Sequence, residues 1–147
     1  MDRQIRLFAE DICDLYCKAY PDKSTAQTDI LLDLVSHALC FGTLCKVADR
    51  PAGFILCMAL GEVADIIEIC VDPHFQNIGI GKALIADAAD QARQKHIQAL
   101  MLEVAIDNDH ARYLYHQTAF VEIARRPDYY ARKSEMVDAI VMKKNLV

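Results

Sequence analysis

The sequence predicts an α/β fold in which a mixed, mostly antiparallel central sheet is flanked by helices. Three observations predict it: two helix-like patterns open the chain, three strand-like patterns follow with short turns between them, and helix and strand patterns then alternate. The chain has 147 residues, of which 54% are hydrophobic and 25% charged. We therefore expect a single domain over residues 1–147, large enough to bury a core.

The N-terminal part of the chain has the pattern of two helices. Apolar residues recur near the helical period over residues 6–20 and again over residues 27–39. Pro21 interrupts the pattern, and Ser24 or Thr25 is expected to cap the second helix.

Strand patterns separated by turn residues, such as those at 49–53 and 61–62, predict an antiparallel meander in the middle of the chain. The expected strands are 41–48, 54–60, 63–71, 98–105, 120–123 and 139–142, and a short strand before Phe8 is left open. The later helices are expected at 80–96 and 111–117.

Bulk composition excludes several classes of function. The formal net charge of -5 offers no basic footprint for nucleic acid or for an anionic membrane surface. The N-terminus lacks the apolar core of a signal peptide, and the longest apolar run, residues 52–60, is too short to span a bilayer. We therefore expect a cytoplasmic protein with no membrane association and no nucleic-acid partner.

The six cysteines do not follow the spacing of a metal site. They form no Cys-x-x-Cys pair, and most lie in apolar runs. A zinc site drawn from His37, Cys40 and Cys45 lacks a fourth ligand. Buried, reduced cysteines and no metal are the expectation.

The most informative segment joins an apolar strand pattern to a helix pattern. Gln76, Gly79 and Gly81 form a Gln-x-x-Gly-x-Gly turn just where helical periodicity begins. Glycines let the backbone approach an anion closely, and a helix N-terminus adds partial positive charge. The segment therefore predicts a cradle for a pyrophosphate, with an ordinary strand–turn–helix junction as the alternative.

Three carboxylates and one phenol are candidates for acid–base chemistry. Glu103 lies in an otherwise apolar strand pattern, where a carboxylate is unfavourable unless it is paired, exposed or functional. Glu68 has the same character in the preceding strand and is an alternative base, with Asp65 a weaker third. Tyr115, on a short helix, is a candidate general acid, although most helical tyrosines serve packing.

Beyond the turn at 76–81, further motifs follow in unbroken order. They are Leu102-Glu103-Val104, Asn108, Ala111, Leu114-Tyr115, Phe120, Arg125-Arg126-Pro127-Asp128-Tyr129-Tyr130 and Asp138-Ala139-Ile140-Val141-Met142. Over residues 63–143 the chain thereby resembles the RimI-type ribosomal-protein alanine N-acetyltransferases, a branch of the GNAT family. Three positions depart from that pattern: Ala119 stands where the family usually has glycine, Asp107 stands where it has serine, and Glu68 replaces a more usual small polar residue. Residues 134–138 fit the pattern loosely.

The resemblance implies a GNAT fold and transfer of an acetyl group from acetyl-CoA to the N-terminal α-amine, usually of alanine, of a ribosomal protein. It implies Glu103 as the general base and Tyr115 as the general acid, without a metal. The residues implied to contact acetyl-CoA are Ile69, Cys70, Val71, Gln76, Asn77, Ile78, Gly79, Ile80, Gly81, Lys82 and Asn108. A loop at 125–130 would border the acceptor peptide through Arg125, Tyr129 and Tyr130.

Two other functions stay open at this point. The turn at 76–81 indicates the co-substrate and not the acceptor, so the acceptor is alternatively another protein N-terminus, a lysine or a small-molecule amine. The third alternative is a non-catalytic regulator that binds acetyl-CoA. The segment 125–130 argues against the former, and Glu103 together with Tyr115 argues against the latter.

Overall fold

The computed structural model describes residues 1–22 and 25–147, so a cap at Ser24 lies outside the described residues. Thr25 is the first residue of the second α-helix. The helices are, in chain order, η1 (Ile5–Phe8), α1 (Ala9–Ala19), α2 (Thr25–Ser36), η2 (Pro73–Phe75), α3 (Ile80–Gln94) and α4 (Asp109–Gln117). The strands are β1 (Cys40–Val47), β2 (Arg50–Leu60), β3 (Val63–Val71), β4 (Ala99–Ala105), β5 (Val121–Arg132) and β6 (Glu135–Asn145).

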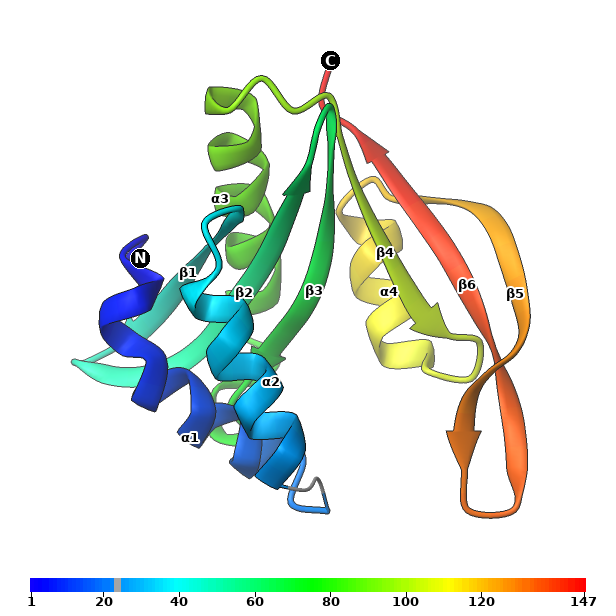
Figure 1. Cartoon of the computed structure of the whole chain (residues 1–147), viewed down its shortest axis with the longest axis horizontal. Coiled ribbons are helices and arrows are strands. Elements are labelled where there is room, and N and C mark those ends of the chain that lie inside the picture. Colours follow the sequence, from blue (N-terminus) through cyan, green and yellow to red (C-terminus); the bar gives the residue numbers. More distant parts are fainter. Residues whose placement is uncertain (23–24) are drawn as a thin grey trace.

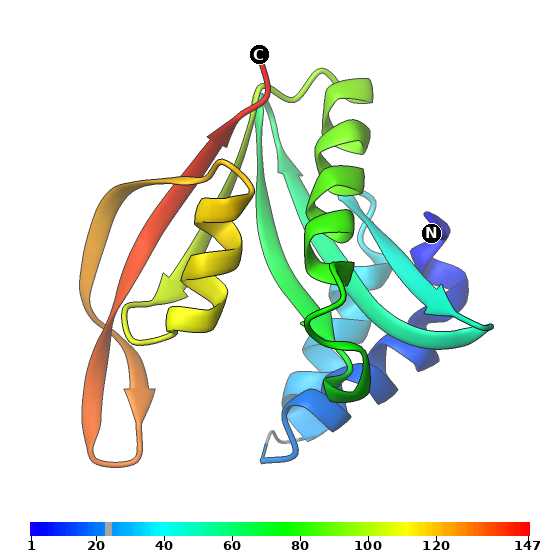
Figure 2. The ribbon, with the colours of Figure 1, turned by 180° about the vertical axis from the view of Figure 1, so that it is seen from behind.

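A six-stranded sheet in the order β1-β2-β3-β4-β6-β5 organises the chain. Helices α1 and α2 lie on one face of the sheet, and α3 and α4 lie on the other (Figure 1 and Figure 2). Neighbouring strands pair antiparallel except β3 and β4, which are parallel. The predicted class, a mixed and mostly antiparallel sheet flanked by helices, is confirmed.

Each face of the sheet carries its own core, because each helix layer presents an apolar side to it. On one face, Leu84 and Ile85 of α3 belong to a buried cluster with sheet residues. On the other, Ile12 and Leu15 of α1 are buried with Phe54 of β2. Within the described residues, no helix combines the length and the apolar character needed to cross a membrane.

The C-terminal hairpin is longer than the sequence predicts. The expected strands at 120–123 and 139–142 are parts of the longer β5 and β6. Residues 125–130, expected to form a loop, lie within β5, where the register shifts between Arg126 and Tyr130. The prediction was wrong because β5 is an edge strand that is exposed along almost its whole length, so its side chains show no alternation.

Two smaller differences concern the turn before β2 and the segment before Phe8. Strand β2 begins at Arg50, so the turn expected over 49–53 is confined to Ala48 and Asp49, with φ angles of +48° and +62°. Two successive positive φ angles are typical of a tight hairpin turn. Of the short strand considered before Phe8, the structure shows a single bridge between Asp2 and Leu44.

A β-bulge in β3 determines which face its later residues occupy. The register against β2 shifts between Ile66 and Glu68, so Ile67 is the extra residue. Before the bulge, Ile66 belongs to the core under α3; after it, Cys70 belongs to the core under α1. Regular alternation would have placed both on one face. The bulge therefore turns the side chain of Glu68 toward α1.

Candidate active site

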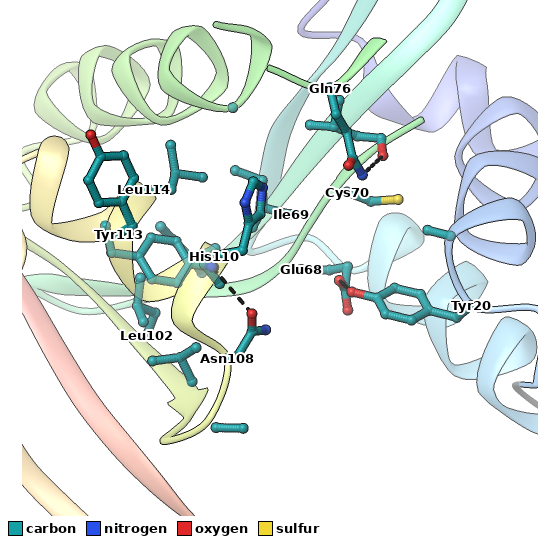
Figure 3. Close-up of a pocket in the computed structure, with 18 of the residues that line it drawn as sticks. Tyr20, Glu68, Ile69, Cys70, Gln76, Leu102, Asn108, His110, Tyr113 and Leu114 are labelled. Atoms are coloured by element: carbon teal, nitrogen blue, oxygen red, sulfur yellow. Dashed lines mark hydrogen bonds between the residues drawn. The ribbon is translucent and has the colours of Figure 1, made fainter. Parts of the chain in front are cut away.

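A cleft opens where the parallel strands β3 and β4 diverge. Residues 63–65 pair with residues 99–101, and in the described part of the chain the ladder between these strands ends there. Beyond that point the two strands border an open volume of about 930 Å³. Its walls also include the first turn of α3, helix α4, the end of β5 and the C-terminal end of α1 (Figure 3).

The first turn of α3 presents its backbone N–H groups at this cleft. Gly79 is the N-cap with φ +92°, a conformation that favours glycine, and Asn77 before it has φ +63°. The first N–H groups of a helix have no partner within the helix, and its N-terminus carries partial positive charge. Ile80 and Lys82 line the cleft with Asn77, whereas Ile78 is 65% exposed and lies outside the lining. This turn can hold an anion.

Gly81 has a packing role that the sequence did not predict. A Cβ atom there would lie 3.0 Å from Cδ2 of Leu114, a contact tighter than normal packing. The absence of a side chain lets α3 approach α4 at the point where both border the cleft. Gly81 therefore shapes the cradle by bringing two of its walls together.

The end of β3 provides backbone to the cleft, while its side chains point to the two cores. Ile69 and Val71 pack against the core under α3. The thiol of Cys70 lies under α1, with its Sγ atom 3.6 Å from the carbonyl oxygen of Leu15, and burial raises its pKa to about 12. At the end of the strand, the side-chain amide of Gln76 donates to the carbonyl oxygen of Val71 at 3.2 Å, which ties the turn to β3.

Asn108 caps α4 on the opposite wall. Its side-chain oxygen accepts a hydrogen bond from the backbone N–H of Ala111 at 3.2 Å, as an N-cap residue does. Asn108 also lines the cleft, so the residue that caps α4 is part of the cleft wall (Figure 3).

Glu103 reaches the cleft from β4 and is held by two side chains of β5. The Nε atom of Arg126 lies 2.9 Å from its Oε1 atom, and the hydroxyl of Tyr129 donates a hydrogen bond to the same carboxylate. The side chain of Glu103 stays 26% exposed. Burial raises the pKa of nearby Asp65, and the charge of Glu103 raises it further. Glu103 is thus an oriented carboxylate in the cleft lining with access to solvent.

Tyr115 lines the same cleft from α4. It is 7% exposed, and its ring meets that of Phe120 edge-on with 5.8 Å between the centroids. Burial raises the pKa of its phenol above the ordinary value, with smaller contributions from the charges of Glu68 and Tyr130. The phenol therefore stays protonated through the physiological range and remains a proton donor.

Of the three residues expected to border an acceptor, one lines the cleft and two lie outside its lining. Tyr130 lines the cleft, whereas Arg125 and Tyr129 lie outside its lining. The Nε atom of Arg125 donates to Asp138 at 2.6 Å, and the backbone N–H of Asp128 donates to the same carboxylate at 2.9 Å. Arg125 therefore holds the hairpin together, while Tyr129 contacts Glu103.

Sequence reasoning missed Arg126 and Tyr20 as site residues. Arg126 contacts Glu103, and the hydroxyl of Tyr20 donates to Oε1 of Glu68 at 3.1 Å. Arg126 stood inside a recognised motif, but only tertiary structure shows which side chain it reaches. Among the described residues, no group of three or more His, Cys, Asp or Glu side chains is placed to hold a metal ion.

The fold is one that known acetyltransferases share. The model of the acetyltransferase (GNAT) family matches residues 9–120, so the chain belongs to the acetyltransferase (GNAT) family.

Particular relatives are also similar. The [Ribosomal protein bS18]-alanine N-acetyltransferase of Salmonella typhimurium is 34% identical over 94 residues, which are 64% of each chain. The protein of the same name from Escherichia coli K12 is 33% identical over 93 residues, 63% of each chain. The matched part of this chain thus spans just under two thirds of the length of these curated relatives.

Solved structures show the same fold. The ribosomal-protein-S18-alanine N-acetyltransferase from Escherichia coli superposes with a TM-score of 0.84 at 22% identity, covering 94% of this chain and 87% of that one. A putative acetyltransferase from Salmonella typhimurium, solved with acetyl-CoA, has a TM-score of 0.84 at 16% identity, covering 97% and 90% of the two chains.

Proposed function

We propose that this protein transfers the acetyl group of acetyl-CoA to the N-terminal α-amine, with alanine first, of a ribosomal protein. One observation carries the proposal: Glu103, Tyr115 and the N-terminal turn of α3 line one cleft. A base, an acid and an anion cradle in one cleft suit acyl transfer from a thioester that carries a pyrophosphate. The names of the curated relatives support the acceptor.

The residues present fit acetyl-CoA as the co-substrate. The turn around Gly79 offers N–H groups to the pyrophosphate, and Lys82 adds a cationic side chain beside it. The backbone of β3 over Ile69–Val71 has no β4 partner in the described ladder, so it can bond to the amides of the pantetheine arm. Asn108 borders the same path from α4.

Glu103 is the general base in this proposal. A protein α-amine has a pKa near 8, so one proton must leave the ammonium before the nitrogen can attack. The carboxylate of Glu103 takes that proton, directly or through water, and the amine then attacks the thioester carbonyl. Arg126 and Tyr129 orient the carboxylate during this step. A free backbone N–H of β3 can stabilise the oxyanion.

Tyr115 is the general acid. When the C–S bond breaks, the departing sulfur takes the phenolic proton. The extra proton on the attacking nitrogen returns to the phenolate through water, so the products are the N-acetylated chain and the free thiol. The raised pKa of the buried phenol keeps that proton available.

We also propose that the protein acts in the cytoplasm, because a ribosomal acceptor is found there. This agrees with the expectation from the sequence.

The test is acetyl transfer followed by intact mass. The acceptors are an alanine-first basic peptide, the same peptide with a blocked N-terminus, and a peptide whose only amine is a lysine. Acetylation of the free α-amine alone supports the proposal. Transfer to the lysine peptide would move the function to another acceptor class, and binding of acetyl-CoA without any transfer would indicate a regulator.

A further inference from the structure

A buried carboxylate lies where β3 leaves the sheet. Asp72 directly follows β3 and is 3% exposed. A carboxylate in such a place is unfavourable unless hydrogen bonds or opposite charges stabilise it. Asp72 lies outside the lining of the cleft, whereas Val71 before it and Phe75 after it are part of that lining. The proposed function gives this carboxylate no role.

Asp72 is the N-cap of η2 and holds the turn through its side chain. Its Oδ1 atom accepts a hydrogen bond from the backbone N–H of His74 at 2.9 Å and lies 3.0 Å from Nδ1 of the same residue. Its Oδ2 atom lies 3.6 Å from Nζ of Lys18 in α1. The hydrogen bond from the backbone of His74 is the main reason why the pKa of Asp72 is lowered below its ordinary value. The charged form of the side chain is therefore the one that holds the turn.

The backbone fixes the same turn from both sides. The N–H of Asp72 donates to the carbonyl oxygen of Ala52 in β2 at 2.8 Å, and the carbonyl oxygen of Asp72 accepts from the N–H of Phe75 at 2.8 Å. Phe75 also packs against the core under α3. Asp72 thus ties η2 to the sheet, and its carboxylate is the part of this connection that a substitution removes.

The anion cradle follows directly after this turn. Asn77 and Gly79 have φ angles of +63° and +92°, and Gly79 is the N-cap of α3. A non-glycine residue keeps a positive φ only where the surrounding structure fixes it. The direction in which the chain leaves Asp72 and η2 therefore determines where the first N–H groups of α3 lie. A site that is already ordered binds its ligand more tightly than one that must become ordered on binding.

We infer that Asp72 is a positioning residue for acetyl-CoA: it holds the turn that carries the pyrophosphate cradle and does not touch the ligand. The inference rests on the proposed function, because it concerns the co-substrate site of the same cleft. Asp72 acts through its hydrogen bond to the backbone of His74, so an uncharged side chain that keeps an acceptor oxygen should replace it. Lys18 is 60% exposed, and an ion pair to such a side chain contributes little.

Calorimetric titration with CoA tests the inference in the intact chain. Asp72→Ala should weaken CoA binding roughly fivefold, the size expected when a lost side-chain cap leaves the turn ordered in a smaller fraction of the molecules. Asp72→Asn should stay within about twofold of wild type, because asparagine caps as well as aspartate. Wild-type affinity in Asp72→Ala overturns the inference, and so does an equal weakening by Asp72→Asn.

Asp2→Ala is the matched control. The Oδ1 atom of Asp2 accepts a hydrogen bond from the backbone N–H of Gln4 at 3.0 Å, so this variant removes the same kind of bond, across two residues, outside the cleft lining. Its affinity for CoA should equal that of wild type. A weakening as large as that of Asp72→Ala would trace the loss to general destabilisation and overturn the inference.

A donor without a pyrophosphate separates positioning from a loss of folded protein. S-acetylpantetheine carries the same thioester as acetyl-CoA but lacks the pyrophosphate. Asp72→Ala should lower kcat/KM about fivefold for acetyl-CoA, while kcat at saturating acetyl-CoA and kcat/KM for S-acetylpantetheine stay unchanged. The ratio of the two kcat/KM values does not depend on the fraction of enzyme that is folded. An equal loss for both donors overturns the inference.

The titration keeps this inference separate from the proposed function, because CoA binding needs no acetyl transfer. A wild-type protein that binds CoA more tightly than Asp72→Ala but acetylates no peptide supports the positioning role and removes the proposed catalysis. A wild-type protein that binds no CoA overturns the inference.

Discussion

Arg126 of β5 reaches across strand β6 to Glu103 of β4, with its Nε atom 2.9 Å from the Oε1 atom of the carboxylate. The two strands are not neighbours in the sheet, since β6 lies between them. This ion pair thus connects the exposed hairpin to the strand of the cleft wall that carries Glu103, with Tyr129 donating to the same carboxylate. The position of the hairpin and the orientation of the proposed base are therefore linked.

This link predicts a loss of rate when Arg126 is shortened. Arg126→Met should lower kcat for acetyl transfer by about tenfold, because a misplaced base reaches the acceptor proton less often. Arg126→Lys should fall in between, since an ammonium cannot reproduce the geometry of a guanidinium. Arg93→Met is the matched control, because it breaks an ion pair of 3.0 Å with Asp90 on the outer side of α3. Equal effects of the two methionine variants would contradict the link.

Alanine variants of two glycines distinguish the effect of backbone strain on stability from an effect on anion binding. Gly79 and Gly61 have φ angles of +92° and +71°, and a Cβ atom on either would meet nothing within 4 Å. Alanine at each should therefore lower the free energy of unfolding by about 1 kcal/mol. Gly79→Ala should also weaken CoA binding, because it alone distorts the first turn of α3. Calorimetric titration with CoA tests this, and similar affinity in both variants would count against the cradle.

Ala119 is strained, at a position where the resemblance to the family leads us to expect glycine. Its φ angle is +67°, as expected if the local turn is kept. Ala119→Gly should raise the free energy of unfolding by about 0.5–1 kcal/mol, since relief of strain exceeds the extra entropy of an unfolded glycine. Ala86→Gly in the exposed face of α3 should lower it by about 1 kcal/mol. Urea unfolding measures both, and a destabilised Ala119→Gly variant would disprove the strain.

The environment of Asp87 in α3 predicts that part of the folding stability is lost at low pH. Burial alone raises the pKa of this carboxyl, but hydrogen bonds from Arg3, Thr43 and Gln91 outweigh burial and lower the pKa below its ordinary value. A carboxyl with a lowered folded-state pKa stabilises the protein above its unfolded value, about 3.9, and loses that contribution as the pH falls through the folded pKa.

Asp87→Asn should therefore be less stable than wild type at pH 7 and lose less stability between pH 5 and pH 2. Asp90→Asn, at an exposed position of the same helix, should follow the wild-type pH dependence. Urea unfolding across that range measures both variants. An Asp87→Asn curve parallel to that of wild type would show that the network around Asp87 has no such role.

Features that depend on neighbouring residues were predicted from the sequence, and features that depend on distant contacts were not. The bounds of β3 were predicted to the residue, because apolar strand residues lie between two turns. Glu103, Tyr115 and Asn108 were predicted to share a site, and all three line one cleft. Their chemical roles stay predictions. The bulge at Ile67 changed the face of Glu68, and one inserted residue leaves no pattern in the sequence.

The structure of the β5–β6 hairpin could not be predicted from the sequence. An exposed edge strand has no buried face, so β5 carried no period from which its length could be predicted. The contact of Arg126 with Glu103 depends on how β5 lies relative to β4 across an intervening strand. Such a relationship is set by pairing between distant segments, and neither composition nor spacing encodes it visibly.

The central claim is that Glu103 accepts the amine proton and Tyr115 supplies a proton to the leaving sulfur. The most direct measurement is kcat for acetyl transfer to an alanine-first peptide by wild type, Glu103→Gln and Tyr115→Phe, with Glu135→Gln at an exposed hairpin position as control. We predict that the first two variants lose about 10²–10⁴-fold in kcat while remaining folded, and that the control keeps the wild-type rate. A folded Glu103→Gln variant that transfers acetyl at the wild-type rate would contradict the mechanism.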